Sequence, residues 1–465
     1  MLVLVSDLHL TGGSSGTTIN ADAFRILRNQ LRTLAYAASW RKDGTYKPIE
    51  GLDLVLLGDV LDVIRSWQYS DIPGAIMPWS DAKTVEFAAR VADRTKAIIA
   101  NNGESLNVLK SMSVDGALTI PADPVPPSDA KSLAEGGEPE GTARRRLPVK
   151  VSTYYQVGNH DWFYHLPGPA FDQIRNEVVA AIGLANDPSQ PFPHDPSEPT
   201  PLKAVYDRHR VLARHGDIYD PFNCERSRDG SSLGDVIVVK LLNRFPAEVR
   251  DRLGSVLPAE CLDGLNEIDN VRPLLMVPVW INGLLNRTCS SGNQIAAVKK
   301  VWDELVDDFL RTPFVQKRDS FWDWFDSVDK LEWALKFSKG VGIATLGEIV
   351  ELAKKVGFGK EEEFFRNALK EAAFQNRTAD FIVYGHTHHF EIVPLDVSSR
   401  TAGLLNQLCI NTGTWRRVYE VAECKPKEQE FIGYDVMTYV AFYADGERTG
   451  RPFETWSGSL GLRVP

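Results

Sequence analysis

Five short apolar runs in this chain are each followed by polar residues that can bind a metal ion, and no other feature constrains the fold as strongly. Short apolar runs that end in glycine or polar residues are typical of buried strands leading into loops. Between the first two runs, apolar residues recur at helical spacing over 24–38. Strand, helix and strand in succession predict an α/β fold. The runs occupy residues 2–5, 54–57, 151–157, 211–213 and 381–384.

The residues that follow these runs provide carboxylate, imidazole and amide groups, and none of them is a cysteine. In α/β folds, functional residues gather where loops leave the carboxyl ends of the strands. Asp7/His9 and His386/His388 are pairs two residues apart, which in an extended chain points both side chains to one side. Singly, each residue has an ordinary structural explanation, so the metal-site hypothesis depends on their occurring together. The full set is Asp7, His9, Asp59, Asn159, His160, Asp161, His215, His386 and His388.

Two stretches of the chain interrupt this pattern. Residues 121–148 are rich in Pro, Gly, Ser and Glu, so we expect a flexible loop there. Residues 223–375 have helical periodicity, with apolar stripes over 298–309, 343–356 and 364–372 and several tryptophans. We predict that this second stretch is a helical insertion, which is either a cap over the site or a homo-oligomer interface. A plain helical core that buries the tryptophans is the alternative.

Composition limits the partners of the chain. It has 62 acidic and 52 basic residues and a net charge of −10, whereas binding to nucleic acid or anionic membranes depends largely on Lys and Arg. The five cysteines are widely spaced without a CxxC pair, as expected for reduced thiols in the cytoplasm. We recognise no signal peptide and no apolar stretch long enough to span a bilayer. We therefore expect a soluble cytoplasmic protein.

Taken in order, the motifs at the five strand ends resemble those of the calcineurin-like metallophosphoesterase superfamily. The resemblance covers roughly residues 1–65, 150–222 and 376–420. It implies a four-layer sandwich, two β-sheets packed face to face with helices outside, formed as one catalytic domain by residues 1–222 and 376–465. The motifs are Asp7-Leu8-His9, Gly58-Asp59-Val60-Leu61-Asp62, Gly158-Asn159-His160-Asp161, His215-Gly216-Asp217 and Gly385-His386-Thr387-His388.

The resemblance also implies two divalent metal ions at the strand ends. A ligand shell of nitrogen and oxygen without sulfur suits Mn²⁺, Fe or Zn²⁺. His160 would lie at the leaving group of the substrate, and Asp161 would orient its ring. One ion would be held by Asp7, His9, Asp59 and His388. Asp59 would bridge to the second ion, whose other ligands would be Asn159, His215 and His386.

These assignments predict hydrolysis of a phosphomonoester, a phosphodiester or a pyrophosphate bond. Two cations about 3.5–4 Å apart offset the negative charge of a phosphate and lower the pKa of a bridging water. The resulting hydroxide attacks phosphorus, and His160 donates a proton to the departing alkoxide. The predicted substrate is a small phosphate ester, which a nucleotide or a lipid could carry. The nearby aspartates are candidates for supporting roles only, namely Asp62, Asp217 and Asp220.

Two further comparisons separate the branches of the superfamily. Val63-Ile64 follows Asp62 where protein Ser/Thr phosphatases have Arg-Gly, and Asp161 follows His160 where they have Glu, which disfavours a phosphoprotein phosphatase. The His215 motif and the later Asn411-Thr412-Gly413-Thr414-Trp415 resemble the UDP-2,3-diacylglucosamine hydrolase branch, which cleaves a nucleotide–lipid pyrophosphate. In that case the helical insertion would be a hydrophobic lid over acyl chains.

The sequence leaves two alternatives open. A metal-dependent nuclease would share the motif that contains His160, but this acidic chain has no basic stripe for duplex DNA. A non-catalytic metal-binding scaffold would have no need of His160 as a proton donor. We expect Arg416 and Arg417 to be a solvated pair rather than a second phosphate site. Three other histidines should have structural or surface roles, namely His165, His194 and His209.

Overall fold

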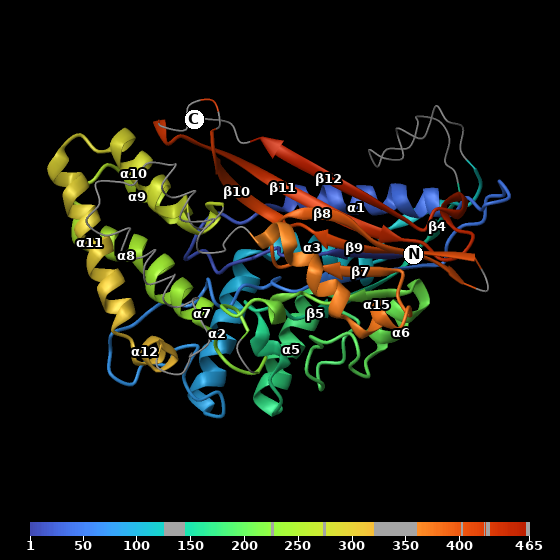
Figure 1. The fold of residues 1–465 in the computed structure, drawn as a ribbon, viewed down its shortest axis with the longest axis horizontal. Coiled ribbons are helices and arrows are strands. Elements are labelled where there is room, and N and C mark those ends of the chain that lie inside the picture. The colour runs from blue at the N-terminus through green and yellow to red at the C-terminus, as the bar shows by residue number, and fades with distance from the viewer. Residues whose placement is uncertain are drawn as a thin grey trace.

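The computed structural model of this chain is a mixed α/β structure in which β-sheets are flanked by helices (Figure 1), which confirms the predicted α/β class. Most of the loop predicted over 121–148 lies outside the described residues. Its two ends pair as a short antiparallel ribbon of β3 (Thr119–Pro121) and β4 (Arg146–Pro148). The structure describes residues 1–124, 145–224, 227–272, 276–319, 360–400, 403–422, 424 and 428–461.

The larger sheet has six strands and a parallel centre. β1 is parallel to β2, and β2 is parallel to β5, whereas β11 lies antiparallel on the other side of β1. β10 and β12 both pair with β11 in antiparallel. β1, β2 and β5 are the first three predicted strands. The bounds are β1 (Leu2–Val5), β2 (Gly51–Leu57), β5 (Lys150–Gln156), β10 (Trp415–Val421), β11 (Phe431–Phe442) and β12 (Phe453–Gly461).

The smaller sheet has four strands in the order β6-β7-β9-β8. β6, β7 and β9 run parallel, whereas β8 and β9 are antiparallel neighbours. β6 and β7 are the last two predicted strands, so all five apolar runs form strands. The bounds are β6 (Val211–Ala213), β7 (Phe381–Tyr384), β8 (Phe390–Arg400) and β9 (Gly403–Thr412).

The two sheets pack face to face across an apolar core. Alternate residues of a strand point to opposite faces, and β1 is buried on both faces. Leu2 and Leu4 belong to the cluster shared with the smaller sheet, whereas Val3 and Val5 belong to the cluster shared with the helices. Burial on both faces explains why these strands read as continuous apolar runs. Other side chains between the sheets include Val55, Leu57, Val211, Ala213, Phe381, Val383, Ile410 and Phe442.

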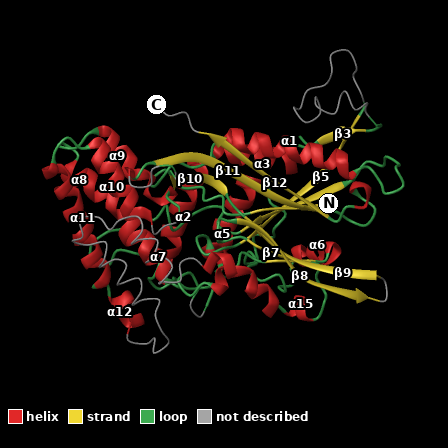
Figure 2. Ribbon diagram, turned by 45° about the horizontal axis from the view of Figure 1, so that its top comes forward, coloured by secondary structure: helices red, strands yellow, loops and turns green. Residues whose placement is uncertain are grey.

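Helices cover the outer faces of both sheets. Figure 2 shows α1 and α3 on one side of the strands and α15 on the other, whereas side chains of α6 join the apolar cluster between the two sheets. α1 contains the predicted apolar stripe over 24–38, and its N-cap residue Asn20 accepts a hydrogen bond from the backbone N–H of Asp22. The bounds are α1 (Ala21–Ala38), α2 (Val85–Asn101), α3 (Gly103–Ser113), α5 (Pro169–Ile182), α6 (Pro201–His209), the 3₁₀ helix η7 (Lys360–Lys370) and α15 (Ala372–Gln375).

The described part of the predicted insertion, 223–375, is helical. Helices α8 to α11 lie together at one end of the molecule (Figure 1). The stripe predicted over 298–309 is the buried face of α11, and its side chains join the same apolar cluster as those of α1 and α2. The stripe over 343–356 lies outside the described residues. The bounds are α7 (Leu233–Ile237), η4 (Val238–Leu242), α8 (Arg244–Leu253), α9 (Ala259–Asn266), η5 (Glu267–Asn270), α10 (Val277–Thr288), α11 (Gly292–Leu310) and α12 (Pro313–Asp319).

The last part of this stretch, the η7 and α15 segment, packs against the smaller sheet. Phe364 and Ala368 of η7 contact the outer face of that sheet. Among the described residues, no helix is both long and apolar enough to cross a membrane. All five cysteines are free thiols, although the sulfur atoms of Cys261 and Cys289 lie 4.0 Å apart.

Candidate metal centre

The residues predicted to form the site come from loops at the carboxyl ends of five strands. In the larger sheet these loops follow β1, β2 and β5, and in the smaller sheet they follow β6 and β7. The site therefore lies where the ends of two packed sheets meet. In chain order, the loops carry Asp7 and His9, then Asp59, then Asn159, His160 and Asp161, then His215, then His386 and His388.

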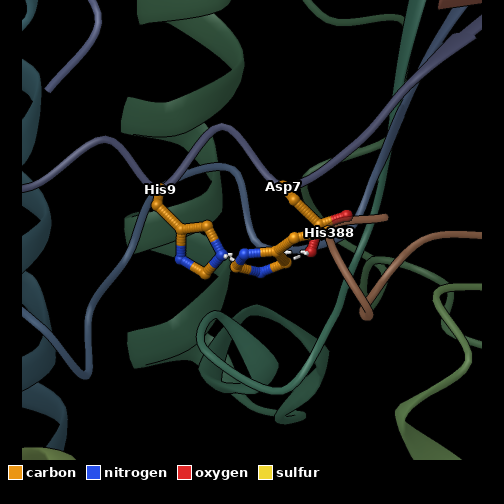
Figure 3. A group of neighbouring side chains, drawn as sticks. All are labelled: Asp7, His9 and His388. Carbon is orange, nitrogen blue, oxygen red and sulfur yellow. Dashed lines mark hydrogen bonds and ion pairs between the residues drawn. The ribbon is translucent and has the colours of Figure 1, made fainter. Parts of the chain in front are cut away.

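One group of potential ligands consists of Asp7, His9 and His388 (Figure 3). Oδ1 of Asp7 lies 3.3 Å from Nε2 of His388 and 3.9 Å from Nε2 of His9. The two Nε2 atoms are 3.0 Å apart, and Figure 3 shows the rings turned toward each other. Oδ2 of Asp59 is 3.7 Å from Nε2 of His9. Four side chains thus direct donor atoms into one small region.

A second group shares both aspartates with the first. Nε2 of His215 is 3.3 Å from Oδ2 of Asp59 and 4.0 Å from Oδ1 of Asp7. The amide oxygen of Asn159 lies 3.1 Å from Nε2 of His215 and 3.1 Å from Nδ1 of His386. Oδ2 of Asp59 therefore lies between donor atoms of the two groups, which is the position that a bridging carboxylate requires.

Three of the imidazoles are held at the ring nitrogen that faces away from the centre. Nδ1 of His215 donates to the last carbonyl oxygen of β2 at 3.0 Å, and Nδ1 of His9 donates to Oδ2 of Asp62 at 2.6 Å. Nε2 of His386 donates to Oδ2 of Asp220 at 3.0 Å. When a metal ion binds, the nitrogen that makes this hydrogen bond keeps its proton, and the other nitrogen of the ring can direct a lone pair into the centre. Metal-binding histidines are oriented in this way.

The backbone of the ligands adopts an uncommon conformation. Asp7, His9, Asp59, His386 and His388 all have positive φ angles, between 45° and 69°. Such angles are uncommon for residues other than glycine, and strained positions of this kind cost about 1–3 kcal/mol each. We expected the two pairs of ligands to converge through extended backbone, but they converge through left-handed turns. Backbone strain concentrates at sites where function requires a particular side-chain direction.

Glycines leave the space that two of the ligands occupy. A Cβ atom at Gly58 would lie 2.4 Å from Nδ1 of His215, and one at Gly158 would lie 2.3 Å from Oδ1 of Asp59. Both distances are far shorter than ordinary van der Waals contact. The glycines that precede Asp59 and Asn159 in the sequence are therefore required by packing around the site.

The buried charges of the centre fit a bound cation. Asp7 is 0% exposed, and its Oδ1 has no hydrogen-bond partner within the described part of the chain. Burial raises the pKa of Asp7, and the charge of Asp59 adds to this rise. Burial also lowers the pKa values of His9 and His388, so both rings are neutral and can offer a lone pair. A metal ion would neutralise the carboxylates and bind the unpartnered oxygen.

The ring of His160 is oriented by Asp62 and not by Asp161, so that part of our prediction is wrong. Nδ1 of His160 lies 2.9 Å from Oδ1 of Asp62, whose other oxygen accepts from His9. Asp161 instead accepts hydrogen bonds from two backbone N–H groups of ligand-bearing loops and from a tyrosine hydroxyl, at 2.6 to 2.8 Å. Asp161 therefore connects the loops after β2 and β5.

The charge of His160 is set by its acidic neighbours. Burial by itself lowers the pKa of His160, but the carboxylates of Asp62 and Asp59 outweigh burial and raise the pKa to about 9. The ring is therefore protonated at neutral pH and can act as a proton donor. Asp62 stands three residues after Asp59 within one motif, and that spacing is the sequence signal that could have assigned its role.

Three arginines lie beside the side of the centre that contains His388. Arg416 is 2% exposed and is therefore not the solvated residue we expected, and its Nε and Nη1 have no hydrogen-bond partner among the described residues. Arg65 and Arg416 both donate to Oδ1 of Asn270, at 3.3 and 2.8 Å. Nε of Arg272 donates to Nδ1 of His388 at 3.2 Å. No sequence motif identifies Arg65 or Arg272.

The position of Arg272 affects how His388 can bind metal. In this arrangement Nδ1 of His388 accepts a hydrogen bond, so the neutral ring carries its proton on Nε2. When Nε2 binds a metal ion, the proton must be on Nδ1, and Arg272 must turn away from the ring. The arginine cluster places positive charge beside the centre, where an anionic group is favoured.

No protein-family model matches this chain, and a search of curated proteins found no relative. The geometry of the centre therefore carries the functional conclusion.

Replacing Gly158 by alanine should displace Asp59 and weaken metal binding. The added Cβ atom would lie 2.3 Å from Oδ1 of Asp59, so the carboxylate must move. We expect the affinity for Mn²⁺ or Zn²⁺, measured by calorimetric titration, to fall by about 10- to 100-fold. Gly103→Ala is the matched control, because a Cβ atom at this first residue of α3 meets no atom within 4 Å. Equal affinities of the two variants would contradict the proposed role of Gly158.

Proposed function

We propose that this chain is a metal-dependent phosphoesterase of the calcineurin-like metallophosphoesterase superfamily, which hydrolyses a phosphomonoester, phosphodiester or pyrophosphate bond. The observation that carries the proposal is that two groups of potential ligands meet at Asp59, with the ring of His160 beside them. A site that only stabilised the fold would have no use for an imidazole held in this place by Asp62. This arrangement favours an enzyme over a metal-binding scaffold.

The proposed ligands are the side chains whose donor atoms face the centre. When bound, two divalent ions would offset the charge of a phosphoryl group and lower the pKa of a water molecule. Nitrogen and oxygen donors without sulfur suit Mn²⁺, Fe or Zn²⁺. We assign one ion to Asp7, His9, Asp59 and His388, and the other to Asp59, Asn159, His215 and His386.

We assign to His160 the protonation of the leaving oxygen. Its Nδ1 is engaged by Asp62, so Nε2 is the nitrogen that can give a proton to the substrate. The ring centroids of His160 and His9 are 4.9 Å apart, which supports a proton donor beside the proposed ligand His9. Asp62 is a positioning residue in this proposal, because it accepts hydrogen bonds from both rings and holds them at a fixed separation.

The arginine cluster supports an anionic substrate. Arg65, Arg272 and Arg416 lie beside His9 and His388, and Nε of Arg65 is 3.3 Å from Asp269 and 3.9 Å from Asp62. Guanidinium groups bind phosphate oxygens well because several N–H donors lie in one plane. A phosphoryl group at the centre would compensate part of this positive charge. Arg417, in contrast, pairs with Asp435 at 2.9 Å.

The packing of the sheets also supports membership of the superfamily. Two sheets face each other across a common apolar core, with helices on both outer faces, as the four-layer sandwich requires. The helical stretch shares one apolar core with the helices that cover the larger sheet. Trp280 and Trp302 are buried in this core. Their burial favours a structural role for these two tryptophans over a lid for acyl chains.

Activity should depend on divalent metal and on Asp59. We expect hydrolysis of p-nitrophenyl phosphate or its bis ester to be lost after chelation and restored by Mn²⁺ or Zn²⁺. Asp59→Asn should abolish turnover and reduce bound metal, because the shared ligand loses its charge. Asp115→Asn, which changes an exposed aspartate, is the control. A metal-loaded protein without activity on a broad phosphoester panel would contradict the proposal, and cleavage of duplex DNA with a salt-sensitive KM would favour the nuclease alternative.

The contribution of His160 should depend on the leaving group. We expect His160→Ala to slow hydrolysis of alkyl phosphates by about 100- to 10,000-fold, because a strongly basic alkoxide needs a proton to depart. Hydrolysis of p-nitrophenyl phosphate should fall much less, because its leaving group is only weakly basic. Metal content, measured by elemental analysis, should stay unchanged. Equal losses on both classes of substrate would show that His160 is not the proton donor.

Loss of Arg272 should weaken substrate binding more than it changes stability. We expect Arg272→Ala to raise KM for an anionic phosphoester by roughly 10-fold, the value of one charged hydrogen bond. Arg287→Ala is the matched control, because Arg287 lies in the same helical stretch and, among the described residues, donates to a backbone carbonyl at 2.9 Å and to no side chain. Steady-state kinetics at several substrate concentrations distinguish the two variants, and an unchanged KM for Arg272→Ala would remove this residue from the substrate site.

A further inference from the structure

A second set of potential metal ligands lies outside the candidate centre, at His165, His194 and Glu198. Each residue offers one ligand atom, and these atoms lie within 4.8 Å of one another. His165 ends the 3₁₀ helix η2 (Trp162–His165), and the other two lie in the loop between α5 and α6. The two imidazole rings stand almost perpendicular, at 82°, with centroids 4.7 Å apart.

Both imidazoles have a nitrogen available to a ligand. Nδ1 of His165 donates to the carbonyl oxygen of Phe192 at 2.9 Å, which leaves Nε2 as the nitrogen with a lone pair. That nitrogen lies 3.7 Å from Oδ1 of Asp229. Nδ1 of His194 is buried and has no hydrogen-bond partner in the described parts of the chain. A buried polar atom without a partner costs free energy, and a bound cation at this nitrogen would remove that cost.

The loop that carries His194 and Glu198 is held in place by hydrogen bonds. Oε1 of Glu198 accepts from the backbone N–H groups of His194 and Asp195, at 3.1 and 2.7 Å. The N–H of Val157 donates to the carbonyl oxygen of Pro193 at 2.9 Å, next to the end of β5. The potential ligands are therefore positioned before any ion binds, which reduces the entropy lost on binding.

The charges around the three residues also favour a cation. The nearest arginines are already paired: Arg214 with Asp195 at 3.1 Å, and Arg228 with Asp217. Burial, with the charge of Arg228, lowers the pKa of His194 to about 3, so its ring is neutral. The carboxylates of Glu198 and Asp229 then contribute negative charge close to the neutral ring of His194 and to Nε2 of His165.

We propose that His165, His194 and Glu198 form a separate site for one Zn²⁺ ion, with Asp229 or water as its fourth ligand. Two imidazoles and a carboxylate are a common ligand set of four-coordinate zinc. Zinc is preferred to Mg²⁺ or Ca²⁺ because two of the ligands are nitrogen. The site uses none of the residues assigned to phosphoester hydrolysis, so it stands independently of that function.

A zinc ion here would brace the loops that carry two residues of the main centre. Nε2 of Gln156 donates to the carbonyl oxygen of His194 at 2.9 Å and to that of Ala213 at 3.2 Å. Gln156 ends β5 three residues before Asn159, and Ala213 ends β6 two residues before His215. The zinc site therefore connects, through one glutamine, to both of these loops.

The test is the number of zinc ions bound per full-length chain. Metal-free protein is titrated with Zn²⁺ against a chromophoric chelator, both in the wild type and in an Asp59→Asn background in which the main centre is impaired. We expect Glu198→Gln and His194→Ala each to lose one equivalent of zinc in both backgrounds. Glu177→Gln, which alters an exposed glutamate on α5, should lose none. Glu198→Gln keeps an oxygen that can accept the two backbone hydrogen bonds, so the loop is expected to stay folded.

A second readout uses Co²⁺ in place of Zn²⁺. The Asp59→Asn protein should show the intense visible absorption of four-coordinate cobalt. The double variant Asp59→Asn/Glu198→Gln should lose this absorption while its circular dichroism is unchanged. Unchanged zinc stoichiometry in both Glu198→Gln and His194→Ala would overturn the proposal. A metal-loaded wild type that binds this zinc but hydrolyses no phosphoester would refute the proposed function and leave the zinc site standing.

Discussion

The candidate centre depends on the burial of two carboxylates side by side. Asp7 and Asp59 are almost completely buried, where like charges repel each other far more strongly than in water. Burial lowers the pKa of His215, but the charges of Asp59 and Asp7 outweigh burial and raise it to about 9. Either a protonated imidazole or a metal ion can therefore neutralise the negative charge of these two carboxylates. Metal binding at such ligands releases protons.

The two sheets provide the rigidity that this arrangement needs. Five ligand residues have positive φ angles, and glycines at 58 and 158 admit side chains that a Cβ atom would displace. Such strain persists only where the surroundings determine the conformation. Here the ligands follow directly on strands that are buried on both faces, so the strain is held by the apolar core between and around the sheets.

Asp62 and the arginine cluster connect the candidate centre to His160 and to the helical stretch. Asp62 accepts hydrogen bonds from His9 and His160, so one carboxylate positions both a proposed metal ligand and the proposed proton donor. Arg272, which belongs to the helical stretch, donates to His388. That stretch shares an apolar cluster with the helices of the larger sheet, and therefore contributes to the fold and to the border of the site.

The sequence by itself determined the five strands that lead into the candidate centre, the long helix α1 and the residues that meet at the strand ends. These follow from local properties, since apolar runs show burial and each residue type shows its ligand chemistry. Only the tertiary structure decided that Asp62 rather than Asp161 orients His160, that Arg416 is buried, and that His165, His194 and Glu198 lie together. The physical reason is that the direction of a side chain in a loop depends on backbone angles and on segments far away in the chain. Left-handed turns at the ligands, and packing of the helical stretch against the core, are not encoded in the spacing of any motif.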